Sequence, residues 1–346
     1  MKLFARIAVI LLLAGLALGV WILSAEPEAG PHSEADPSAK NNGAPMPGAV
    51  KIPVFSSSLD CKQCHQEIYD EWMGSHHQIA YTNPEVRKLS NDFRNKECQA
   101  CHLPRPILET GLAKRPLPRY DRPNEGVGCI TCHMDAKQRI VGRRSRPDVG
   151  CSPIRNEKWL TTDSCKTCHN QHKTTDQWAA STYPSLNIDC SSCHMPVIQR
   201  GHGVAGRQHI FPGAHDIDTL RTAAEFRARK QGKKVIVEVE NKGAGHNFPT
   251  EERHRAVDVL YRFVAQSQLE QDAPGFTRLY RFRQPYIGDP TPNTQLPAHK
   301  TWRGEISLEG QSAKGKILQL RLVYKLQPFM PDHEAKQLHE HRISIE

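Results

Sequence analysis

Five copies of one pattern, Cys-x-x-Cys-His, account for ten of the eleven cysteines in this 346-residue chain. The two thiols of each copy are three residues apart, close to one helical turn, so both can face the same side of a helix. The histidine follows the second thiol directly. The thiols are Cys61, Cys64, Cys98, Cys101, Cys129, Cys132, Cys165, Cys168, Cys190 and Cys193, and the histidines are His65, His102, His133, His169 and His194.

Covalent attachment of c-type haem explains this spacing. Two thiols one turn apart can form thioethers with the two vinyl groups of a haem, and the next imidazole then reaches the iron as proximal ligand. Zinc ribbons and disulfides are the alternatives, but neither requires a histidine after every second cysteine. We therefore predict five covalently bound haems, and we expect the remaining cysteine, Cys151, to be a free thiol.

The N-terminus predicts export. Lys2 and Arg6 precede an apolar run over residues 7–23, which is longer than the core of most signal peptides and at the lower limit for a membrane span. Residues 1–25 are therefore a signal peptide or an N-terminal membrane anchor, and both possibilities stay open. In either case the cysteine usage predicts a periplasmic or cell-envelope protein, and an uncleaved segment 7–23 would tether it to the inner membrane.

Two further segments carry the rest of the amino-terminal part. Residues 26–55 are rich in Pro and Ala without a period of 2 or 3.6, which predicts a flexible tether. Residues 56–225 contain all five motifs, which begin 25 to 37 residues apart. So little chain per haem cannot build a conventional core around each one. We expect the haems themselves to form the core, wrapped by short helices and Pro-rich loops.

The carboxyl-terminal part has a different period. Residues 219–231 predict a helix ended by Gly232, and the alternation of residues 235–240 predicts a strand. Further runs at 256–265, 277–282, 304–308 and 316–326 have strand character, separated by turn residues. We predict an α+β protein: a mostly helical and loop-rich haem domain, followed over 226–346 by a small antiparallel β-sandwich without haem motifs.

The formal net charge of +9 does not indicate a nucleic-acid-binding protein. Five haems carry ten propionates, which offset this charge and need basic partners nearby, and export removes access to cellular nucleic acid. The basic residues predict propionate partners or a docking surface. The expected partners are redox proteins or a membrane quinol-oxidising complex.

Several stretches resemble the multihaem cytochromes of the cytochrome c-554/c-prime family. They are Tyr69, Trp72, Ser75 and His77 after the first motif, Gly126-Val127-Gly128, Met195-Pro196, and the segments 209–216 and 245–250. The resemblance covers about residues 58–250. It implies mainly bis-histidine haems, stacked in pairs, that serve electron transfer in respiratory or nitrogen metabolism.

The second axial ligands must come from the remaining histidines. His77 ends the family-like pattern Trp-x-x-Ser-x-His, and its neighbour His76 points about 100° away on a helix. His209 and His246 lie in family-like loops flanked by Phe and Pro. We predict these as distal iron ligands: His77, His209 and His246. Weaker candidates are His215 and His202. Ligation by many His and few Met implies low reduction potentials.

Two functions remain open. The first is a non-catalytic electron carrier, and the second is an oxidoreductase with one open haem that acts on a nitrogen oxide, hydroxylamine or peroxide. The second rests on the sequence from Trp178 to Tyr183, which repeats the Trp-x-x-Ser-x pattern but puts tyrosine where His77 stands. Tyr183 either leaves an iron open or packs on a porphyrin while another histidine ligates. A neutral phenol is a poor iron ligand.

Overall fold

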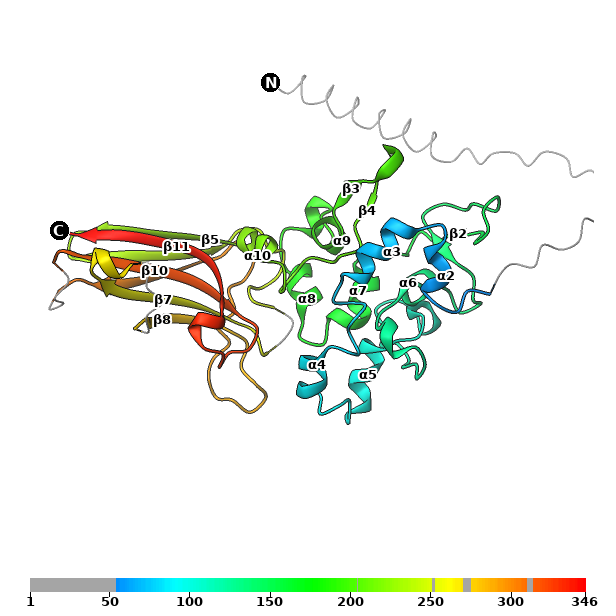
Figure 1. Ribbon diagram of the computed structural model, residues 1–346, viewed down its shortest axis with the longest axis horizontal. Coiled ribbons are helices and arrows are strands. Elements are labelled where there is room, and N and C mark those ends of the chain that lie inside the picture. The colour runs from blue at the N-terminus through cyan, green and yellow to red at the C-terminus, as the bar shows by residue number, and fades with distance from the viewer. Residues whose placement is uncertain (1–53, 204, 251–252, 270–274, 310–313) are drawn as a thin grey trace, which may run out of the picture. The chain divides into compact units, whose positions relative to one another are not determined.

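The computed structural model describes residues 54–203, 205–250, 253–269, 275–309 and 314–346 (Figure 1). These residues belong to one compact unit. The predicted signal or anchor at 7–23 and nearly all of the predicted tether lie outside them. Within the described ranges, no helix has both the length and the apolar character that a bilayer span requires.

Short helices and loops make up the first half of the described chain (Figure 1). The helices are α2 (Leu59–Lys62), α3 (Gln66–Met73), α4 (Pro84–Leu89), α5 (Lys96–His102), α6 (Cys129–His133), α7 (Thr162–His169), α8 (Thr174–Ala179) and α9 (Cys190–His194). Two small ladders accompany them, β1 (Val141–Gly142) with β2 (Ile154–Arg155), and β3 (Val197–Gln199) with β4 (Ala205–Arg207). Proline-rich loops keep the helices short, as expected from the sequence.

The second half begins with α10 (Ile217–Ala223) and continues as two antiparallel sheets. One sheet has the order β5-β6-β9, and the other has the order β11-β10-β7-β8. The strands are β5 (Ala224–Gln231), β6 (Lys234–Asn241), β7 (Ala256–Val264), β8 (Thr277–Phe282), β9 (Thr301–Ser307), β10 (Lys316–Lys325) and β11 (Lys336–Ile345). The α+β class is therefore confirmed.

Both sheets contribute to one apolar core. Val235, Val237 and Val239 of β6 are fully buried, as are Leu318 and Leu320 of β10. Alternate residues of a strand point to one face, so each strand places its apolar residues on the shared side. Phe248, in the loop that follows β6, also belongs to this core, so the core anchors that loop.

The predicted helix over 219–231 is wrong in its second half. Residues from Ala224 onward form β5, which pairs in register with β6 from Ala224–Asn241 to Gln231–Lys234. Gly232, expected to end a helix, adopts φ +60° in the tight turn between the two strands. The strand β11 was not predicted either. β11 is a strand because it pairs with β10. Its own sequence, which is rich in charged residues and His, does not predict a strand.

Candidate functional site

One connected cavity of about 1940 Å³ is lined mainly by the helices and loops of the first half, and also by residues of the β-rich half, among them His246 and Tyr324. All ten motif cysteines and all five motif histidines line it. Pockets for single small molecules typically measure roughly 300–1,000 Å³. The size of the cavity and its donors therefore fit several large groups, each held by two thiols and an imidazole. No cysteine of the chain, all eleven being described, is in a disulfide.

Each motif is placed by a helix. The last four motifs lie in α5, α6, α7 and α9, and each of these helices ends at the motif histidine. The first motif spans the end of α2 and the turn before α3. In the last four motifs the helix brings both thiols, at positions i and i+3, onto one face, and the thiols of all five motifs line the cavity.

Thiols from different motifs contact one another, which brings distant parts of the chain together. Cys61 contacts Cys129, Cys101 contacts Cys168, and Cys165 contacts Cys190. The first motif therefore neighbours the third, and the fourth neighbours both the second and the fifth. Sequence order does not give this arrangement.

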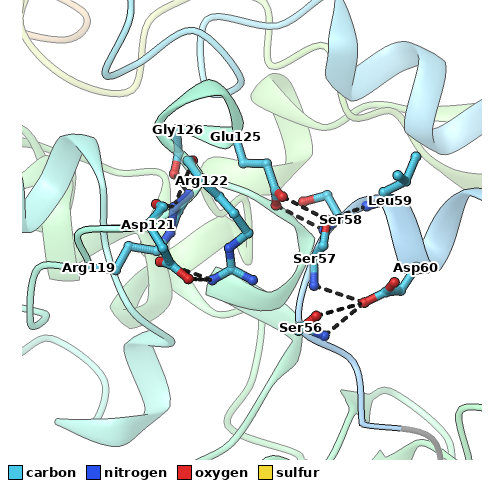
Figure 2. A network of polar contacts seen from close by, with 10 residues as sticks. All are labelled: Ser56, Ser57, Ser58, Leu59, Asp60, Arg119, Asp121, Arg122, Glu125 and Gly126. Atoms are coloured by element: carbon cyan, nitrogen blue, oxygen red, sulfur yellow. Dashed lines mark hydrogen bonds and ion pairs between the residues drawn. The ribbon is translucent and has the colours of Figure 1, made fainter.

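The contact between the first and third motifs is reinforced by a polar network (Figure 2). Ser57 Oγ donates to Glu125 Oε1 at 2.7 Å, and the Ser58 amide donates to Glu125 Oε2 at 2.9 Å. Arg119 donates to the Gly126 carbonyl at 2.6 Å. A Cβ on Gly126 would lie 2.4 Å from the His77 carbonyl, so only glycine permits this approach.

Three motif histidines have their Nδ1 atoms fixed by backbone carbonyls. His102 Nδ1 lies 2.9 Å from Ala80 O, His133 Nδ1 lies 3.3 Å from Val141 O, and His194 Nδ1 lies 2.6 Å from Pro212 O. A carbonyl can only accept, so Nδ1 must carry the proton in each contact. The other nitrogen, Nε2, then keeps its lone pair for a metal.

The predicted distal ligands lie opposite motif histidines. His77 pairs with His169 at a ring-centre distance of 6.0 Å, His209 with His133 at 6.4 Å, and His246 with His194 at 6.2 Å. With a metal–imidazole bond of about 2.0 Å on each side, as in zinc sites, two axial rings have centres about 6.4 Å apart. The three spacings therefore fit an iron between each pair.

Polar side chains from distant segments hold the loop of His209. Its amide donates to Glu71 Oε2 at 2.8 Å, and Glu71 forms a bidentate pair with Arg200 at 2.7 and 2.9 Å. Arg200 also donates to the Arg207 carbonyl, which lies 2.9 Å from His209 Nδ1. Neither Glu71 nor Arg200 was predicted from the sequence, because no local pattern links residues so far apart in the chain.

The β-rich half supplies His246. This residue lies in the loop between β6 and β7, and Asn241 at the end of β6 donates to its carbonyl at 2.8 Å. Gln177 of α8 accepts from Thr250 Oγ1 at 2.7 Å and from the Asn247 amide at 3.2 Å. The loop is thus fastened to both halves, and His246 Nδ1 lies 2.9 Å from the Asn247 carbonyl.

Desolvation keeps these imidazoles neutral. It lowers the pKa of His77 to about 3 and the pKa values of His133 and His246 to about 4. Burial also lowers the pKa of His194 and of His209. A neutral ring is the form that binds a metal, so no proton has to be displaced at neutral pH.

Tyr183 is not directed at His169, which pairs with His77. Its hydroxyl donates to the Lys242 carbonyl at 3.4 Å, and its ring stacks on His299 at 5.1 Å. The geometry therefore favours a packing role for Tyr183 over an open iron beside His169.

The remaining histidines occupy varied places. His76 stacks on His215 at 3.7 Å, a spacing too short for a metal between the rings. His254 lines the cavity, and its Nδ1 lies 2.8 Å from the Tyr286 hydroxyl. The side chain of His202 lies outside the described part. Cys151 also lines the cavity.

These features define a class of protein: a c-type cytochrome with several haem-attachment motifs around one cavity. Residues 60–134, which hold the first three motifs, match the family model described as cytochrome c554 and c-prime. No curated protein sequence matches the chain.

Among solved structures, the chain resembles a penta-heme cytochrome c552 from Thermochromatium tepidum. The TM-score is 0.60 at 19% sequence identity, and the match covers 84% of this chain and 99% of that one. The two chains share a fold. The family match supports the resemblance inferred from the sequence motifs over residues 60–134. With the five motifs around one cavity, it supports a multihaem c-type cytochrome with a β-rich carboxyl-terminal part.

Proposed function

We propose that the protein is an exported electron carrier of a respiratory chain, with five covalently bound and mainly bis-histidine haems. Haem, when bound, supplies a one-electron iron couple whose potential depends on the axial ligands and their surroundings. The observation that carries the proposal is the set of three histidine pairs, spaced 6.0 to 6.4 Å apart across the cavity.

The chain's own residues have distinct parts in this function. The paired imidazoles would occupy both axial positions, which leaves an iron no open site for a substrate. Cys61 lies beside Cys129, Cys101 beside Cys168, and Cys165 beside Cys190, so the haems attached there would be neighbours. Adjacency matters because electron tunnelling decays exponentially with distance. Histidine ligation without methionine implies low potentials.

The location and partners follow from the sequence. The apolar segment at residues 7–23 would direct the chain to the periplasm or cell envelope, as a signal peptide or an anchor to the inner membrane. There the carrier would exchange electrons with redox proteins or a quinol-oxidising complex.

The second candidate is a multihaem oxidoreductase with one open haem, acting on a nitrogen oxide, hydroxylamine or peroxide. The three pairs involve His133, His169 and His194, so an open iron would belong to the motif of His65 or of His102.

One preparation of the mature exported protein tests both candidates. Intact-mass spectrometry should give five haem additions, and the reduced spectrum should not change with carbon monoxide. Fewer than five additions would contradict the cofactor count. One carbon monoxide bound per chain would contradict the carrier function and support the oxidoreductase with an open haem.

A further inference from the structure

The first and third motifs make the same contacts with each other as the fourth and fifth motifs do. In each pair a tryptophan after the leading motif donates its indole N–H to the carbonyl two residues before the first cysteine of the other motif. Trp72 donates to Val127 O at 2.9 Å, and Trp178 donates to Ile188 O at 3.0 Å. A serine three residues on donates to the carbonyl of that tryptophan at 2.7 Å in both cases.

The motif cysteines show the same correspondence between the two pairs. The first cysteines touch within each pair, Cys61 with Cys129 and Cys165 with Cys190. A hydroxyl three residues before the leading motif also contacts the first cysteine of the other motif. Ser58 Oγ accepts from the Cys129 amide at 3.0 Å, and the Cys190 thiol lies 3.7 Å from Thr162 Oγ1.

We propose that Trp72 and Trp178 are equivalent positioning residues, each of which sets the spacing between the two haems of one motif pair. Each indole ties the helix after one motif to the start of the next, so it acts through the backbone that carries the attachment cysteines. Trp72 is 4% exposed, and a rigid buried ring leaves little freedom for the segment it holds. The inference rests on the proposed electron-carrier function, because haem spacing governs electron exchange.

The same correspondence explains why Tyr183 stands where the first pair has His77. In the pair of the first and third motifs, His77 lies two residues after the serine, and its ring faces that of His169 in the fourth motif. In the pair of the fourth and fifth motifs, Tyr183 takes this position, and its ring stacks on His299 instead. The first motif pair would thus supply the second axial ligand at the motif of His169, whereas Tyr183 of the other pair packs on His299.

The test replaces each indole while keeping an aromatic ring. Trp72→Phe and Trp178→Phe remove the N–H donor, and Trp302→Phe in β9 is the control, because Trp302 packs on Tyr280 and Phe282 in the β-rich half. Ferric EPR spectra and a reductive titration of the holoprotein report each haem separately. Mass spectrometry verifies that all haems are attached.

Trp72→Phe should shift the potentials and EPR signals of two haems, and Trp178→Phe should shift those of two others. Trp302→Phe should shift none. A shift confined to one haem, the same shift in all variants, or no shift would overturn the assignment. Where a tryptophan variant does not fold, Ser75→Ala and Ser181→Ala give the milder perturbation of the same pairs. A haem that binds carbon monoxide would contradict the carrier function, but it would not affect the shifts of two haems in each tryptophan variant.

Discussion

Replacing Glu71 by Gln tests whether a buried ion pair fixes the axial loop of His209. The Glu71 side chain is 14% exposed and that of Arg200 is 9% exposed. Burial acts to raise the pKa of Glu71, but hydrogen bonds from Arg200 and the His209 amide outweigh it and hold that pKa below its usual value. Gln keeps one acceptor oxygen and loses the charge, so Arg200 remains buried without its anion.

The magnitude follows from these contacts. Removing one partner of a fully buried ion pair costs about 3–5 kcal/mol. The pair here keeps some exposure, and the amide retains one of the two acceptors, so we expect Glu71→Gln to lower the free energy of unfolding by about 2–3 kcal/mol. The loosened loop should also convert part of one low-spin haem to high spin.

Chemical denaturation of the holoprotein, followed by far-UV circular dichroism, measures the first effect. The absorption spectrum measures the second. Glu67→Gln is the matched control, because Glu67 lies on the same helix, is exposed, and accepts a hydrogen bond from the Gly201 amide at 3.3 Å. The control should change stability by less than about 0.5 kcal/mol. Equal effects of both variants, or an unchanged spin state in Glu71→Gln, would refute the reasoning.

Three further predictions use the same preparation. His77→Ala and His246→Ala should each give one high-spin, carbon monoxide-binding haem in the reduced protein, and a fully low-spin spectrum would exclude that residue as a ligand. Tyr183→Phe should leave every haem low-spin, because the Tyr183 hydroxyl donates to the Lys242 carbonyl. A changed spin state in the same spectrum would indicate that Tyr183 is a ligand. Burial acts to raise the pKa of Glu340, but bonds from Arg342, Arg321 and Gln319 hold it below the usual 4.5. The Glu340 carboxylate therefore stabilises the fold above about pH 4.5, and this contribution is lost as pH falls below that value. Glu340→Gln should flatten the acid part of a curve of unfolding free energy against pH. An unchanged curve would contradict this role of Glu340.

The sequence alone determined the attachment chemistry. Each Cys-x-x-Cys-His motif is complete within five residues, and a helix of that length places both thiols on one face whatever surrounds it. The alternation at residues 235–240 likewise predicted a strand, which the structure places in β6. Local spacing is enough where one short element contains all the groups that act together.

Only the tertiary structure decided how the motifs are arranged. Residues 224–231 read as a helix in isolation and become a strand because β6 offers them a full ladder of partners. The pairings of His77 with His169 and of His133 with His209 span 92 and 76 residues, and no period in the chain encodes them. Glu71 and Arg200 meet 129 residues apart for the same reason. Contacts between distant segments form only when the whole core closes, so their partners cannot be read from local pattern.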